Sequence, residues 1–114
     1  MPPRNWQMRI RDILDAIAAI EGYTRDMDFE AFRADRRTVH AVIRNITVIG
    51  EAARNLPQDV VDGHPDIPWR LMRDFRNVVV HAYFRVDERI VWDTLTEDLP
   101  DLVGPLQRLL AQEQ

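Results

Sequence analysis

The sequence of 114 residues contains no cysteine, no serine and no lysine. Without cysteine the protein can form no disulfide, no thiolate metal site and no cysteine nucleophile, which fits the reducing cytoplasm where we expect it. Without serine it can build no serine-based catalytic triad. No stretch reaches the roughly 18 to 20 apolar residues of a membrane span, and the start of the chain lacks the apolar run of a signal peptide. We therefore expect a soluble protein that does not enter a membrane.

All fifteen basic residues are arginine, yet the formal net charge is −4. This charge argues against a surface coated evenly with positive charge for nucleic acid, but it leaves room for a local basic cleft. Arginine suits bidentate contacts to phosphate, although a genomic bias toward arginine codons also accounts for the missing lysine. The length suggests a single domain over residues 1–114, whose modest core a second copy would help to stabilise.

Apolar residues recur at helical spacing along most of the first half of the chain. We expect a first helix from about Asn5 to Glu21, with Asn5 as its N-cap and Gly22 as its C-terminal stop. A short helix over Phe29 to Ala34 follows. The next helix is long, because its apolar spacing extends from Asp35, a suitable N-cap, to Leu56.

The second half predicts two further long helices. Residues 58–68 form a connection with about one helical turn, and a third helix runs from Trp69 to about Tyr83. Residues Val86 to Glu88 open the last helix with Asp87 as N-cap, and Pro100 should kink or divide it. Four main helices with short connections predict an all-α, antiparallel four-helix bundle with an extra short helix or a kinked last helix.

The third predicted helix carries residue types suited to cutting RNA without a metal ion. Such cleavage needs a base for the ribose 2′-hydroxyl, an acid for the departing 5′-oxygen, and a cation for the phosphate. Histidine can serve as base and acid near neutral pH, and arginine binds phosphate with charge-assisted hydrogen bonds. Arg76 and His81 supply these types, with Asn77 and Tyr83 close by in sequence. The alternative is that His81 complements a helix end and that Arg76 is merely solvated.

Helix geometry keeps the two catalytic candidates apart. Arg76 and Tyr83 share a face, Asn77 and His81 share another, and Arg76 and His81 point about 140° apart. Either the helix loosens near His81, or two copies of the chain meet and each supplies part of the cleft. A two-fold dimer would also bring two histidines together, one as base and one as acid.

Three polar residues of the long helix predicted from Asp35 to Leu56 are further candidates. Arg44, Asn45 and Glu51 flank its apolar face, so they either form a structural hydrogen-bond network or dimer contact, or they support His81 as a cleft wall. His40 on the same helix is interpreted as structural. Three scattered histidines lack the spacing of a metal site, and we expect neither a metal ion nor a cofactor.

The order Arg76, four residues, His81, one residue, Tyr83 resembles the motif of the HEPN superfamily, in its branch of HepT-like toxins. The polar Asn77 after the arginine is usual there. The likeness covers nearly the whole chain and extends to Arg44-Asn45, Ile49-Gly50-Glu51-Ala52, Pro68-Trp69-Arg70, Tyr83-Phe84, Val86-Asp87 and Trp92. A local difference is Arg73-Asp74-Phe75, where many relatives carry a smaller stretch with glycine.

The resemblance implies a homodimeric endoribonuclease that acts as a toxin. It also implies a neighbouring minimal nucleotidyltransferase (MNT) as antitoxin, which transfers AMP from ATP to the motif tyrosine, Tyr83. The added bulk and negative charge would block RNA at a phosphate-binding cleft. The alternative is a non-catalytic module that binds nucleotide or serves as a scaffold for the nucleotidyltransferase.

Overall fold

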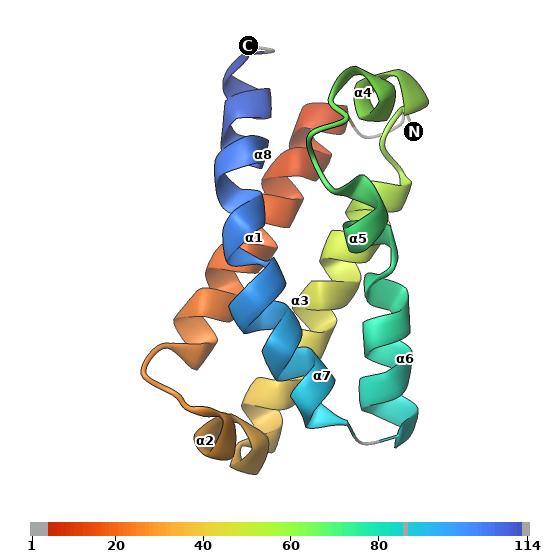
Figure 1. Cartoon of the computed structure of the whole chain (residues 1–114). Helices are drawn as coiled ribbons and strands as arrows, with labels where there is room; N and C mark the ends of the chain where they lie inside the picture. Colours follow the sequence, from red (N-terminus) through yellow and green to blue (C-terminus); the bar gives the residue numbers. More distant parts are fainter. Residues whose placement is uncertain (1–4, 86, 113–114) are drawn as a thin grey trace.

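The computed structural model describes residues 5–85 and 87–112, and every regular element within them is a helix. The main helical segments run antiparallel along the long axis of the molecule, in chain order α1, α3, α5 with α6, and α7 continuing into α8 (Figure 1). The expected all-α, antiparallel bundle is confirmed. The elements are α1 (Trp6–Thr24), α2 (Phe29–Ala34), α3 (Arg36–Arg54), α4 (Gln58–Gly63), α5 (Trp69–Arg73), α6 (Phe75–Arg85), α7 (Glu88–Asp93), the π-helical η1 (Thr94–Asp98) and α8 (Pro100–Gln112).

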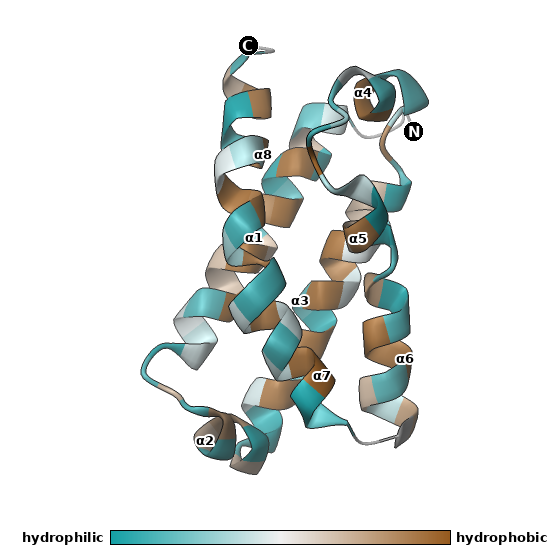
Figure 2. Ribbon diagram, viewed as in Figure 1, coloured by the Kyte–Doolittle hydropathy of each residue, from teal (hydrophilic) through white to brown (hydrophobic). Residues whose placement is uncertain are grey.

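Helix α3 is the central element, because it packs against α1 on one side and against α5 and α6 on another. Apolar and polar bands alternate along the helices, as expected for helices with one buried face (Figure 2). Burial of each large aliphatic side chain contributes about 1.5–3 kcal/mol. Within the described residues, no helix combines the length and the apolar character needed to cross a membrane. The fully buried aliphatic side chains include Ile10, Ile13, Ile17, Ile20, Ile46, Ile49, Leu99, Leu102 and Leu106.

The predicted helix starts are confirmed by their capping hydrogen bonds. Asn5 Oδ1 accepts from the N–H of Gln7 at 2.9 Å, and Asp35 Oδ1 accepts from the N–H of Thr38 at 3.1 Å. Asp87 caps α7 in the same way, although Val86, which we expected to open this helix, lies outside the described residues. These caps satisfy backbone donors that no helical carbonyl can reach.

The expected stop of the first helix at Gly22 is wrong. Helix α1 continues to Thr24, which is buried and whose hydroxyl donates to the carbonyl of Ile20 at 2.8 Å. The chain turns two residues later, at Asp26, with a φ of 66°. Burial of Thr24 therefore outweighs the local tendency of glycine to end the helix.

The third predicted helix is not continuous, because it breaks at Asp74 into α5 and α6. The N–H of Asn77 bonds to the Asp74 carbonyl at 2.8 Å, a tight three-residue turn. Met72 before the break and Phe75 after it are both fully buried. Opposite them, a Cβ atom on Gly50 of α3 would lie 3.4 Å from the Met72 carbonyl and 3.7 Å from the Phe75 Cβ. The break thus allows both side chains to pack closely against α3.

The predicted division of the last helix at Pro100 is confirmed. The segment η1 separates α7 from α8, and Pro100 is the first residue of α8. The N–H of Leu99 bonds to the carbonyl of Thr94, five residues earlier, at 3.1 Å. Pro100 occupies the first position of α8, where its missing N–H is tolerated, whereas Pro105 lies inside α8 without ending it.

Candidate functional site

Helix α6 carries the candidate catalytic residues and is uninterrupted from Phe75 to Arg85. It therefore does not loosen near His81, and the first of the two ways to bring His81 and Arg76 together is wrong. Phe75 and Ala82 of α6 are buried, and Val78 and Val79 are partly buried against the same core.

Arg76 lies on the flank of α6 that faces α3 and is exposed. It lines a hollow of about 310 Å³ together with Thr47, Gly50, Glu51 and Arg54 of α3. Among residues 5–85 and 87–112 it forms no ion pair, even though Glu51 lines the same hollow. The guanidinium group is therefore accessible to an anion from outside.

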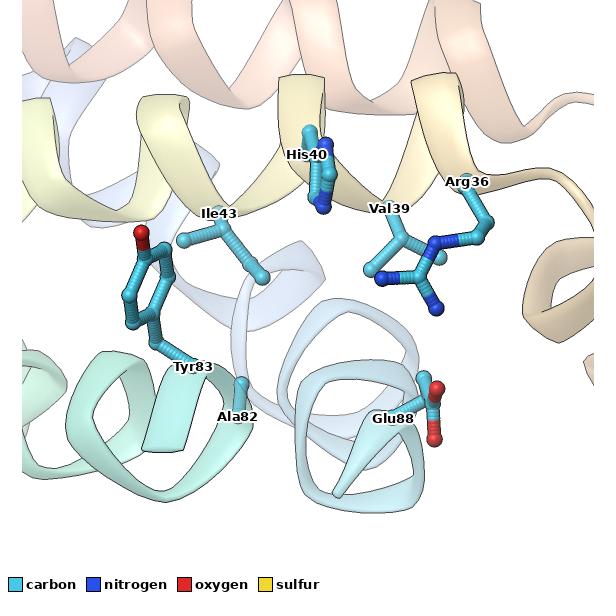
Figure 3. A pocket seen from close by; sticks show the side chains of 7 residues that line it. All are labelled: Arg36, Val39, His40, Ile43, Ala82, Tyr83 and Glu88. Atoms are coloured by element: carbon cyan, nitrogen blue, oxygen red, sulfur yellow. The ribbon is translucent and has the colours of Figure 1, made fainter. Parts of the chain in front are cut away.

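Tyr83 lies two turns further along the same flank and is 68% exposed. Its ring forms one end of a second hollow, of about 390 Å³, with His40 and Ile43 pointing in from α3 and with Arg36 and Glu88 at the other end (Figure 3). The hollow thus joins an aromatic ring and aliphatic groups to charged groups of both signs.

The two hollows follow one another along the same side of the molecule, which we call the α3–α6 seam. On α3 their lining residues recur every three or four positions, so they form one stripe along the helix. Arg76 and Tyr83 line the α6 edge of the seam, seven residues apart. The stripe on α3 consists of Arg36, His40, Ile43, Thr47, Gly50, Glu51 and Arg54.

His81 is half-buried and lines neither hollow of the seam. Five residues after Arg76 in an unbroken helix, it points about 140° away from that arginine. Asn77, four residues before His81, is exposed and lies on the His81 side. A single chain therefore brings Arg76 and Tyr83 together along the seam, and it places His81 and Asn77 away from them.

The three polar candidates on α3 have different surroundings. The Asn45 side chain donates to the carbonyl of Ala41 at 2.9 Å, a bond within its own helix that agrees with the structural interpretation. Arg44 is exposed, and Glu51 lines the hollow of Arg76. Support of His81 by these residues stays a prediction.

Sequence reasoning did not single out Arg36 and Arg54, which line the seam at its two ends. His40, interpreted from the sequence as structural, is exposed and lines the Tyr83 hollow. The three- and four-residue spacing of polar residues beside the apolar stripe of α3 is the signal that could have indicated them. In the part of the chain that the structure describes, no three histidine or carboxylate side chains gather as a metal site.

Nearly the whole chain is similar in sequence to known proteins. The family model described as "Ribonuclease HepT-like" matches residues 13–109. The chain is 47% identical over 100 residues to the "Probable ribonuclease HepT" of Thermococcus cleftensis, a match that covers 88% of this chain and 91% of the relative. Two proteins of Methanocaldococcus jannaschii, each named "Putative RNase", are 34% identical over 110 residues, or 96% of this chain and 91% and 95% of theirs. No solved structure matches the chain.

Proposed function

Because the chain belongs to the HepT-like ribonuclease family, we propose that it is a metal-independent endoribonuclease. Arg76 binds the scissile phosphate, His81 transfers protons and Asn77 orients the cleft. The observation that carries this assignment is the motif on α6, in a family of ribonucleases. It consists of an exposed arginine without an ion pair among the described residues, and a histidine five residues later. Tyr83 contacts the RNA beside Arg76, since both line the seam.

The reaction needs only groups that the chain itself supplies. The 2′-oxygen of the ribose attacks the adjacent phosphorus and forms a new P–O bond, while the bond from phosphorus to the 5′-oxygen breaks. A neutral histidine takes the 2′-hydroxyl proton, and a protonated histidine gives a proton to the departing 5′-oxygen. Arg76 stabilises the negative charge that grows on the phosphate oxygens. The products are a 2′,3′-cyclic phosphate and a free 5′-hydroxyl.

The separation of Arg76 and His81 on α6 supports a two-fold dimer as the active form. In such a dimer each composite cleft can combine the arginine of one chain with histidine from both. Exposed apolar side chains on the outer part of α6 support this arrangement, because Val80 is 44% exposed and Phe84 is 76% exposed.

We further propose that the protein is a cytoplasmic toxin controlled by a minimal nucleotidyltransferase. The phenol oxygen of Tyr83 attacks the α-phosphorus of ATP, loses its proton, and displaces pyrophosphate. The resulting AMP group adds bulk and negative charge beside Arg76, where the RNA phosphate has to bind. The exposure of Tyr83 supports access by a partner enzyme.

The decisive experiment is incubation of the purified protein with labelled RNA in EDTA. Cleavage with a 2′,3′-cyclic phosphate end is expected, and His81→Ala should lower the rate about 100-fold or more. His64→Ala, which removes a histidine outside α6, is the control and should cleave at the wild-type rate. Loss of all cleavage in EDTA, restored by magnesium, would reject the mechanism. Tight nucleotide binding with no RNA cleavage would favour the non-catalytic scaffold instead.

A further inference from the structure

Four arginines gather at the end of the seam where α3, α5 and α6 meet. Arg54 lines the hollow of Arg76, and it also lines a neighbouring hollow of about 460 Å³ with Arg73. Arg73 in turn shares a third hollow, of about 540 Å³, with Arg70. The four residues come from α3 and from α5 and α6, which follow one another end to end beside α3 (Figure 1). We call them the arginine band, and it is continuous with the proposed site because Arg76 is one of its members.

One hydrogen bond joins the two residues in the middle of the arginine band, Arg54 and Arg73. Arg54 Nη2 donates a hydrogen bond to the backbone carbonyl of Arg73 at 3.4 Å. Arg73 is half-buried, and its Nε is buried with no acceptor among the described residues. A buried N–H without an acceptor is unfavourable. The Arg73 side chain also lines two of the hollows. A ligand with oxygen acceptors and negative charge would therefore complement the arginine side chains that line these hollows.

The charge of the arginine band is local and is only partly balanced by the chain. The three hollows are lined by four arginines and by two carboxylates, Glu51 and Asp62. Asp62 is engaged by a neighbour, since its Oδ1 accepts from Gln58 Nε2 at 2.8 Å. The whole chain, by contrast, has a formal net charge of −4. Positive charge is thus concentrated in a series of hollows on an otherwise acidic protein.

We propose that the arginine band binds phosphates of the RNA strand to one side of the cleavage point. The strand then runs from Arg76 past Arg54 and Arg73 toward α5, away from Tyr83. Guanidinium groups suit this ligand because their planar forks bind phosphate with two parallel hydrogen bonds. Hollows in series along one line fit a flexible single strand. The inference rests on the proposed function for the position of the scissile phosphate at Arg76.

The test measures RNA binding separately from cleavage. In the His81→Ala background, fluorescence anisotropy compares a labelled 12-nucleotide RNA with a 4-nucleotide RNA over a range of salt concentrations. The double variant Arg54→Gln/Arg73→Gln should weaken binding of the longer RNA about tenfold or more. The salt dependence should also become weaker. The slope of log affinity against log salt should be less negative by about 1.4, since each lost single-strand phosphate contact removes about 0.7. Binding of the shorter RNA should change much less.

Two further variants separate charge from folding. Arg11→Gln/Arg108→Gln removes the same charge from α1 and α8, and it should leave the salt slope unchanged. Arg54→Lys/Arg73→Lys keeps the charge without the planar fork, so it should retain the slope and lose only part of the affinity. Thermal unfolding of all the variants identifies any that fold poorly. If the glutamine double variant folds poorly, the affinity and the salt slope of the lysine double variant are compared with those of the parent protein.

The outcomes distinguish this inference from the proposed function. Equal affinity and equal slope in the glutamine variant and its α1–α8 control would overturn the arginine band as an RNA surface. Unchanged RNA binding with weakened binding to the purified nucleotidyltransferase would overturn it in favour of a protein surface. Absence of cleavage by the wild-type chain, with the predicted loss of RNA binding, would refute the nuclease and uphold the arginine band.

Discussion

Arg76 and Tyr83 lie two turns apart on one flank of α6 and line separate hollows on the same side of α3. His81, between them in sequence, lines neither hollow. The consequence is a division of labour within one helix. One flank presents the Arg76 guanidinium and the exposed Tyr83 phenol along the α3–α6 seam, and His81 lies on the other flank.

Replacement of the exposed apolar residues of α6 should separate the proposed dimer. We expect Val80→Glu/Phe84→Glu to be monomeric at about micromolar concentration and to lose RNA cleavage, because like charges would meet across the two-fold axis. Light scattering coupled to size exclusion measures the mass of the particle. Met8→Glu/Val48→Glu places the same charges on apolar side chains exposed elsewhere, on α1 and α3, and should stay dimeric. A wild-type protein that is entirely monomeric and still cuts RNA would contradict the proposal that two chains share one cleft.

If the proposed nucleotidyltransferase partner controls this protein, its modification should fall on Tyr83 and abolish RNA cleavage. The chain has two tyrosines, and Tyr23 is also exposed, at 47%, so it serves as an internal control. Mass spectrometry of the co-expressed pair should find AMP on Tyr83 alone, and Tyr83→Phe should escape modification. AMP on another residue, or a modified protein that cuts RNA at the unmodified rate, would contradict this control mechanism.

Enlargement of Gly50 should disturb the packing that holds Arg76 in place. A Cβ there lies 3.4 Å from the Met72 carbonyl, so Gly50→Ala is tolerated, whereas the branched side chain of Gly50→Val has to push α5 and α6 away. We expect Gly50→Val to lower the free energy of unfolding by about 1–3 kcal/mol, the usual cost of overpacking. Urea unfolding measures it.

The matched control is Gly22→Ala in α1. No atom lies within 4 Å of a Cβ built there, and the residue is helical, so the substitution should stabilise the protein by about 0.5–1 kcal/mol. Equal effects of Gly50→Val and Gly50→Ala would show that α5 and α6 are not closely fitted to α3.

Stability should fall as the pH rises through the titration of Asp98. Partial burial raises the pKa of the Asp98 carboxyl above its usual 3.8, and the charges of Asp101 and Asp93 raise it further. The folded protein thus holds this proton more tightly than the unfolded chain between the usual and the raised pKa, so deprotonation across that window destabilises the fold.

Asp98→Asn should therefore raise the melting temperature at pH 7 and should have less effect below the usual pKa of aspartate. Asp15→Asn, which removes an exposed carboxylate of α1, serves as the control. Melting curves from pH 3 to pH 7 compare the two variants. A melting temperature at pH 7 that Asp98→Asn leaves unchanged would contradict the destabilising role of this charge.

Local information was sufficient to predict the helices and most of their ends. The caps at Asn5, Asp35 and Asp87 depend on a side chain and a backbone N–H two or three residues away, so they can be recognised without knowledge of the fold. The division at Pro100 was predicted from the missing N–H of one residue, although the same argument does not distinguish Pro100 from Pro105, which lies inside α8. The motif of Arg76, His81 and Tyr83 is also local, and its spacing by itself predicted that Arg76 and His81 diverge.

The tertiary structure decided what depends on contacts between distant segments. The break at Asp74 arises because Met72 and Phe75 both pack against α3 near Gly50, some twenty residues earlier in the chain. Arg54 joins Arg73 and Arg76 because α3 ends beside the start of α6. Periodicity tells which face of each helix is apolar. Only the packing of those faces determines which polar residues meet at their edges, since that depends on the shapes of both partners together.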